Sequence, residues 1–225
     1  MDYNLLKNNR VTIAGEVVSD LVFSHETYGE KFYETMLKVS RLSDIYDIIP
    51  ITISERLITD KDISIGSNIA GSGQFRSYNK LEDGKSKLML TVFIRELLAY
   101  EEGDNANSID IVGYVCKEPV FRTTPFKREI ADVLLAVNRS YNKSDYLPCI
   151  AWGRNARFVK NFEVGDKVSV SGRIQSREYQ KKIGDEIVTK TAYEVSLSRV
   201  EIVREESDVD TVLTSVGVLE NYYVR

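Results

Sequence analysis

The chain has 225 residues, 43% of them hydrophobic and 28% charged, which is ordinary for a globular protein and excludes an intrinsically disordered one. The net charge of −4 is unevenly distributed: residues 1–105 carry 12 Lys and Arg against 17 Asp and Glu, residues 106–203 carry 16 against 12, and residues 204–225 carry 2 against 5. Two cysteines and one histidine, His25, exclude a disulfide scaffold, a histidine-based triad and a multi-histidine metal site. We expect no cofactor, and the basic segment suggests a polyanionic ligand.

The N-terminal residues MDYNLLKNNRVTI lack the basic, apolar and small-residue regions of a signal peptide. No apolar run approaches the roughly 18 residues that span a bilayer. These features favour a cytoplasmic protein with no membrane contact.

The sequence repeats itself at an offset of 98 to 99 residues, which predicts two copies of one domain. Each copy has about 100 residues, a common domain size. We expect a first domain over 1–100, a polar linker over 101–107, a second domain over 108–203 and a tail over 204–225 that is acidic and then β-prone. The matching segments are VTIAGEVV (11–18) with IDIVGYVC (109–116), MLKVSR (36–41) with LLAVNR (134–139), DIIPITISER (47–56) with DYLPCIAWGR (145–154), and IGSNIAGSGQ (65–74) with VGDKVSVSGR (164–173).

Both copies consist of short β-prone runs bounded by turn residues. In the second copy, GRNARFVKNF (153–162) predicts a short helix between the third and fourth runs; in the first copy, ERLITDKDI (55–63) predicts a shorter connection in its place. Five strands with a helix after the third are typical of an OB-fold barrel. The predicted fold class is therefore all-β, with two tandem five-stranded OB-fold barrels, the second with a short helix between strands 3 and 4.

The second copy interleaves aromatic and basic residues. Alternation in DYLPCIAWGR directs Leu147, Cys149 and Ala151 to the core and leaves Tyr146 and Trp152 on the outer face. Unpaired bases stack on aromatic rings, and phosphates attract cations, so this pattern favours single-stranded nucleic acid. The residues that complete the pattern are Tyr141, Tyr179, Arg173, Arg177, Lys181 and Lys182.

Through these residues the second copy resembles the bacterial single-stranded DNA-binding protein family. The matching segments are IVGYVCKEPVFRTTP, LLAVNRSY, CIAWGRNARFV, VGDKVSVSGRIQSREYQ and TAYEVSLSRVEIV, in the family's order. The resemblance implies base stacking on Tyr141, Tyr146, Trp152 and Tyr179 and phosphate contacts from Arg122, Arg139, Arg154, Arg173 and Arg177. It also implies a homodimer with four barrels, and roles in DNA replication, recombination and repair at the nucleoid.

The first copy departs from this pattern, because Ser43, Ile48 and Ser54 stand where Tyr141, Tyr146 and Trp152 stand in the second. It is also acidic, which favours a degenerate scaffold or assembly module. Its remaining nucleic-acid-binding candidates are Phe75, Arg76 and Tyr78, together with Arg41 and Arg56. The tail lacks the family's usual short apolar tip.

Each of these residues also has an interpretation that involves no nucleic acid. Outward aromatics such as Tyr141 and Tyr179 are also found as cross-strand pairs, Trp152 would also suit a subunit contact, and a single basic residue is usually a solvated surface charge. The alternative function is a primosome-type OB-fold adaptor that acts mainly through protein–protein contacts. Replication or repair proteins are the protein partners that we expect. An enzyme would need carboxylates clustered beside the aromatic and basic residues, and the sequence has none there.

Overall fold

The computed structural model describes residues 8–41, 43, 45–82, 84–104, 106–183 and 186–204, without the side chains of Glu82, Lys85, Lys181 and Ile183; the expected acidic and β-prone tail from residue 205 lies outside the described residues. No helix in these ranges is long and apolar enough to span a membrane. The strands in them are β1 (Asn9–Val17), β2 (Val22–Thr27), β3 (Glu30–Ser40), β4 (Tyr46–Ser54), β5 (Asn68–Glu82), β6 (Lys85–Leu98), β7 (Asn107–Thr123), β8 (Glu129–Arg139), β9 (Lys143–Trp152), β10 (Lys167–Ile183) and β11 (Glu186–Ile202).

Each half of the chain closes into a small barrel with the same pairing. In the second barrel the antiparallel order β10–β7–β8–β9 is completed by the antiparallel pair β10–β11 and a parallel contact between β11 and β9. In the first barrel β5–β1–β3–β4 is completed by β5–β6 and by a parallel contact between β6 and β4. The pair β1 and β2 replaces the single long strand β7, so the predicted five-strand layout is confirmed in both halves.

The helices follow the third strand of each barrel. Helix α2 (Arg154–Val159) forms where the sequence predicts it, with Ala156 and Val159 buried. The first barrel also has a single helical turn, α1 (Glu55–Ile58), where a shorter connection in place of the helix was expected. The Ser54 side chain accepts a hydrogen bond from the Arg56 N–H and thereby caps this turn.

The cores are filled by the inward faces of matching strands. Leu147, Cys149 and Ala151 of β9 are buried as predicted, and so are Ile49, Ile51 and Ile53 at the corresponding positions of β4. Ile150, which alternation assigns to the outer face, is also buried.

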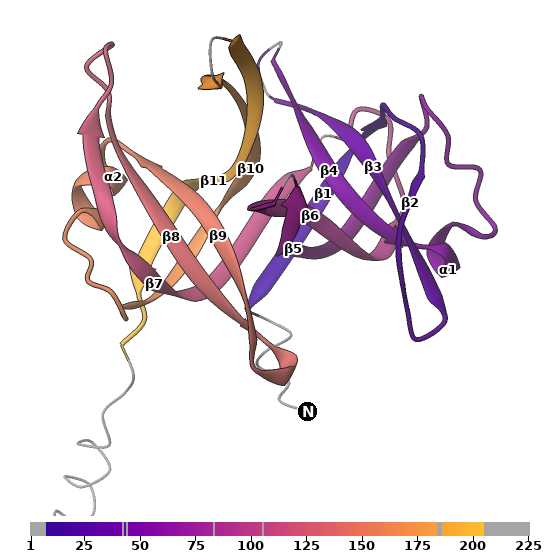
Figure 1. The fold of residues 1–225 in the computed structure, drawn as a ribbon, viewed down its shortest axis with the longest axis horizontal. Helices are drawn as coiled ribbons and strands as arrows, with labels where there is room; N and C mark the ends of the chain where they lie inside the picture. Colours follow the sequence, from indigo (N-terminus) through magenta and orange to yellow (C-terminus); the bar gives the residue numbers. More distant parts are fainter. Residues whose placement is uncertain are drawn as a thin grey trace, which may run out of the picture.

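The two barrels share one continuous sheet of eleven described strands, because β1 pairs with β7 in antiparallel register (Figure 1). Val11 lies opposite Ile109, and Asn9 pairs with Ile111 as Ile13 pairs with Asn107. This register relates the barrels by a local two-fold axis through the centre of the β1–β7 ladder. The segment after β6 therefore separates the barrels in sequence, whereas the sheet joins them.

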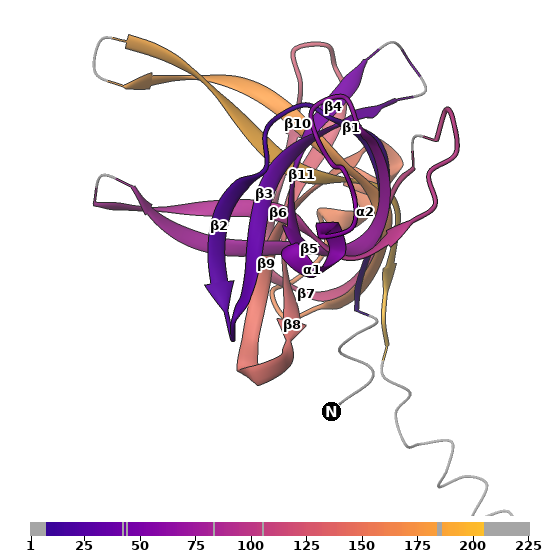
Figure 2. The same cartoon turned by 90° about the vertical axis from the view of Figure 1, so that its right-hand side faces the viewer.

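Two long hairpins extend beyond the barrel walls on the same side of the molecule (Figure 2). One is formed by β5 and β6, and the other by β10 and β11. In Figure 1 the β10–β11 hairpin stands between the two barrels. Each hairpin contacts the third strand of the opposite barrel, as the hydrogen bonds of two aspartates show.

Candidate nucleic-acid interface

Asp47 of β4 is a fully buried carboxylate at the junction of the barrels. Arg41 Nε and Nη2 donate to its two oxygens at 2.7 and 2.6 Å. From the second barrel, the Ser176 N–H donates at 2.8 Å and Arg173 Nη1 at 3.2 Å. The side chain of Ser176 in turn accepts a hydrogen bond from the Ile48 N–H. Asp47 therefore ties the β10–β11 hairpin to the first barrel.

Asp145 of β9 forms the reciprocal contact, and its side chain is 1% exposed. Arg139 Nη1 donates at 3.3 Å, and from the first barrel Arg76 Nη1 donates at 3.4 Å and the Ser77 N–H at 2.8 Å. The Tyr146 N–H donates to Ser77 Oγ at 2.7 Å. Both hairpins are thus held by a buried aspartate of the other barrel.

These surroundings shift several pKa values. Burial opposes the ionisation of Asp47, but hydrogen bonds from Arg41 and the Ser176 N–H and the charges of Arg41 and Arg173 outweigh it, so its pKa lies below the ordinary value. Burial, then repulsion from Arg139, lowers the pKa of Arg76 to about 10. Burial, then repulsion from Arg41, also lowers the pKa of Arg173. At neutral pH all of these groups are charged.

Three arginines that the sequence predicts to bind nucleic acid also have a structural role. Arg76, Arg139 and Arg173 form ion pairs with the buried aspartates, and their side chains are 19%, 34% and 36% exposed. The sequence predicts these arginines as nucleic-acid contacts or as solvated surface charges, and does not predict their ion pairs with the aspartates. Their guanidinium groups still line surface grooves, so each links the junction of the barrels to a candidate binding surface.

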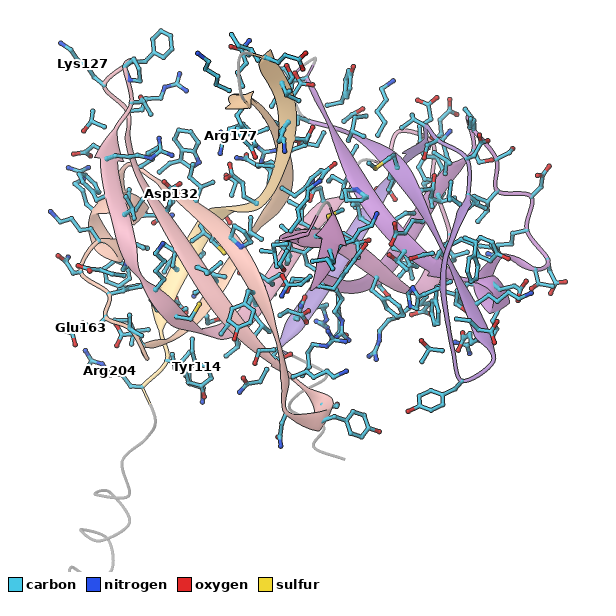
Figure 3. The ribbon with its side chains drawn as sticks, in the orientation of Figure 1. Tyr114, Lys127, Asp132, Glu163, Arg177 and Arg204 are labelled. Carbon is cyan, nitrogen blue, oxygen red and sulfur yellow. The ribbon has the colours of Figure 1, made fainter. Side chains whose placement is uncertain are left out.

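The first of these surfaces, which we call the Trp152 groove, lies between β9, β10 and the first barrel. The indole of Trp152 is 38% exposed. Figure 3 shows Arg177 of β10 at the same upper end of the second barrel as Lys127 in the β7–β8 turn. The groove brings together one ring and four guanidinium groups; its lining residues are Trp152, Arg41, Arg128, Arg173, Arg177, Gln175, Ser176 and Ser196.

The β10 hairpin continues the basic and aromatic surface. The guanidinium of Arg177 lies 6.0 Å from the ring centroid of Tyr179, and its Nε lies 3.5 Å from the carboxylate of Glu194. Lys182 is exposed near the end of β10. Lys181 lies on the same strand, but its side chain is outside the described part of the structure.

The second surface, the Tyr141 groove, lies at the β8–β9 turn. Tyr141 is 88% exposed and has a φ of 63°, a left-handed conformation unusual for a bulky residue. Tyr146, on β9, is 47% exposed. The charged and aromatic residues lining this groove are Tyr141, Arg76, Arg95, Arg139, Lys143 and Asp145.

Other predicted residues are placed differently. Phe75 is 0% exposed in the core of the first barrel, so its assignment to nucleic acid is wrong. Consecutive strand residues point to opposite faces, and Phe75 is adjacent to the outward Arg76. Arg122 pairs with Asp132 of β8 at 2.8 Å, and this hydrogen bond raises its pKa. Arg154 is exposed at the start of α2, outside all of these grooves.

Sequence reasoning missed Arg128 and Arg95. Arg128 follows the β7–β8 turn, and Arg95 is an exposed residue of β6 in the acidic first copy. Arg128 ends the segment FRTTPFKR (121–128), in which Phe121 and Phe126 alternate with basic residues, so the aromatic and basic pattern could have identified it. Arg95 is an isolated cation in an acidic copy, and the sequence contains no such signal for it. Within the described ranges, no group of three or more His, Cys, Asp or Glu side chains is arranged to hold a metal ion.

Comparison with known proteins identifies relatives of the second barrel. The Single-strand binding protein family matches residues 106–203. Single-stranded DNA-binding protein A of Bacillus subtilis is 34% identical over 88 residues, or 36% of this chain, and the chain spans about half (51%) of that relative's length. Single-stranded DNA-binding protein B of the same organism is 36% identical over 85 residues, which are 35% of this chain and 75% of the relative.

The likeness to a solved structure extends through both barrels. The wild-type single-stranded DNA binding protein from Thermus aquaticus matches with a TM-score of 0.72 over 88% of this chain and 94% of that one, at 18% identity. This likeness confirms the fold with two OB barrels. The family model matches residues 106–203, and the chain is 36% identical to single-stranded DNA-binding protein B over an alignment that covers 75% of that relative. The chain therefore belongs to the single-strand binding protein family.

Proposed function

We propose that this chain binds single-stranded DNA, with the Trp152 groove of the second barrel as its principal site. The observation that carries the proposal is the meeting of one exposed indole with the guanidinium groups of Arg128, Arg173 and Arg177. Bases would stack on Trp152, and the arginines would neutralise the phosphates beside it. Neither contact reads a base edge, so binding at this groove is largely independent of sequence.

The strand would follow β9 towards the Tyr141 groove. Tyr146 and Trp152 lie six residues apart on the same strand and are both exposed. At about 3.3 Å per residue, their rings are separated by roughly 20 Å along β9. Tyr179 flanks this path from β10. Arg154 and Lys182 would supply further phosphate contacts at its margins.

The same proposal includes the setting in which the protein acts. We expect a non-catalytic role in DNA replication, recombination and repair, in the cytoplasm at the nucleoid. We also propose that residues 1–100 and 108–203 form the two domains and that two chains assemble into a homodimer with four barrels. A solution mass of twice 25.6 kDa would support this assembly, and a monomeric mass would contradict it.

The experiment that tests the binding site is the double variant Trp152→Ala, Tyr146→Ala. Each stacked ring contributes roughly 1–3 kcal/mol, so together they should weaken the binding of oligo-dT by about 30-fold or more. Tyr28→Ala is the control, because Tyr28 is fully exposed at the β2–β3 turn of the other barrel. If the folded double variant binds as tightly as this control, the site is wrong.

A further inference from the structure

The first barrel has a groove of its own, which we call the Tyr78 groove, between β2, β5 and β6. Phe23 and Tyr78 are 54% and 39% exposed, and Phe93 also lines the groove. Basic side chains of Arg76, Lys80 and Arg139 also line it. The groove therefore combines aromatic rings with cations, although the first copy lacks the stacking residues of the second.

The Tyr78 groove is the structural counterpart of the Trp152 groove. Ile51 pairs with Val92 as Cys149 pairs with Val195, so the next residues, Phe93 and Ser196, are equivalent. Ser77 and Ser176 make equivalent contacts with the opposite barrel, so Tyr78 takes the position of Arg177. The first barrel thus carries Tyr78 and Phe93 where the second has Arg177 and Ser196, and only its third ring, Phe23, has an aromatic counterpart, Phe121. The alignment with Tyr141, Tyr146 and Trp152 therefore finds no ring at those three positions of the first copy.

Glu34 of β3 distinguishes this groove chemically. Its Oε1 accepts hydrogen bonds from Ser24 Oγ at 2.8 Å and from the Tyr78 hydroxyl at 3.2 Å. In the second barrel the equivalent Asp132 pairs instead with Arg122. His25 lies opposite Phe32 as Arg122 lies opposite Ile130, and Ser24 is the extra residue at a bulge of β2. Among the described residues, no lysine or arginine pairs with Glu34, and none donates to its Oε2. The Oε2 atom of this half-buried carboxylate therefore faces an aromatic groove without a hydrogen-bond donor from the described part of the chain, and a ligand can donate to it.

A carboxylate in this position selects among nucleobases. It accepts hydrogen bonds from the amino groups of cytosine, adenine and guanine. Thymine has no amino group, and its single ring N–H lies between two carbonyl oxygens that the carboxylate would repel. An unpaired polar group at such a site penalises the wrong ligand.

We propose that the Tyr78 groove binds a base of the same DNA strand and that Glu34 makes it favour bases with an amino group over thymine. The inference rests on the proposed binding of single-stranded DNA and adds a base preference to it. Stacking on Phe23 and Tyr78 would hold the base, and Arg76 and Arg139 would meet its phosphates. The second barrel would bind without regard to sequence, and the first would bias the composition of the bound strand.

The test compares the affinities of the full chain for labelled oligo-dC and oligo-dT by fluorescence anisotropy. Oligomers of about 32 nucleotides would reach both barrels, since one OB fold covers up to roughly 16. Glu34→Ala should lower the ratio of dC to dT affinity by about five- to tenfold, because cytosine loses an acceptor while thymine gains the hydroxyls of Ser24 and Tyr78 as donors. Glu26→Ala removes the same charge from an exposed residue of β2 and should leave the ratio unchanged.

Phe23→Ala provides a second measurement that does not depend on Glu34. Because stacking tolerates every base, it should weaken the binding of both oligomers by the same factor, and the ring is exposed enough for the core to stay intact. An unchanged dC to dT ratio in Glu34→Ala would overturn the base preference. Trp152 quenching in the same titrations separates the two proposals: if neither oligomer quenches or binds, the DNA-binding function itself fails.

Discussion

The buried aspartates make a quantitative prediction about stability. In Asp47→Asn, one carboxylate oxygen becomes an NH₂ group that faces the donors of Arg41 and Arg173. Breaking a buried ion pair by removing one partner costs roughly 3–5 kcal/mol. For a chain of this size each kcal/mol lowers Tm by about 2–4 °C, so Tm should fall by roughly 6–20 °C.

The reciprocal site sharpens the test. Asp145 is equally buried, but its arginine contacts, at 3.3 and 3.4 Å, are longer than the 2.6 and 2.7 Å contacts between Arg41 and Asp47. Asp145→Asn should therefore lower Tm less than Asp47→Asn does. Asp132→Asn is the matched control, because its ion pair is exposed and contributes at most about 1 kcal/mol. Thermal unfolding followed by circular dichroism measures all three, and equal Tm values for Asp47→Asn and Asp132→Asn would refute the role of the buried aspartate.

Three further predictions concern acid stability, the core and the DNA surface. Because the pKa of Asp47 is lower in the folded chain, the ionised carboxylate stabilises the fold at pH values above its unfolded pKa of about 4, and this stabilisation is lost as the pH falls through the folded pKa. The difference in unfolding free energy between wild type and Asp47→Asn, measured by urea unfolding, should therefore narrow below about pH 4. A difference that stays constant with pH would contradict this. Phe75→Ala should cost roughly 3–5 kcal/mol of unfolding free energy because the ring is fully buried, whereas a normal Tm with weakened DNA binding would restore the original assignment. Arg154→Ala should leave Tm unchanged and reduce the slope of log affinity against log salt by about one, and an unchanged slope would remove Arg154 from the interface.

The sequence predicted the barrel layout because core-facing residues repeat every second position. Leu147, Cys149 and Ala151 match Ile49, Ile51 and Ile53 in both spacing and burial. The exposure of Tyr146 and Trp152 followed from the same period of two. This alternation can be recognised within one strand, without knowing which strands pair with it.

The contacts at the junction of the barrels could not be predicted from the sequence, because they join residues that are far apart in the chain. Asp47 and Ser176 are 129 positions apart, and Asp145 and Ser77 are 68 apart. Both aspartates appear in the repeat, yet their pairing with arginines of the opposite barrel requires the β1–β7 ladder and the two long hairpins. For the same reason, the sequence predicts Arg173 and Arg76 as nucleic-acid contacts and does not predict their ion pairs with the aspartates.

The most direct test of DNA binding is a titration of Trp152 fluorescence with oligo-dT at several salt concentrations. Trp152 is the only tryptophan in the chain, so the signal comes from the proposed groove alone. Saturable quenching that weakens as salt rises would place bases on the indole and phosphates beside the arginines. Absence of quenching, with no binding by anisotropy, would contradict DNA binding and favour a protein–protein adaptor.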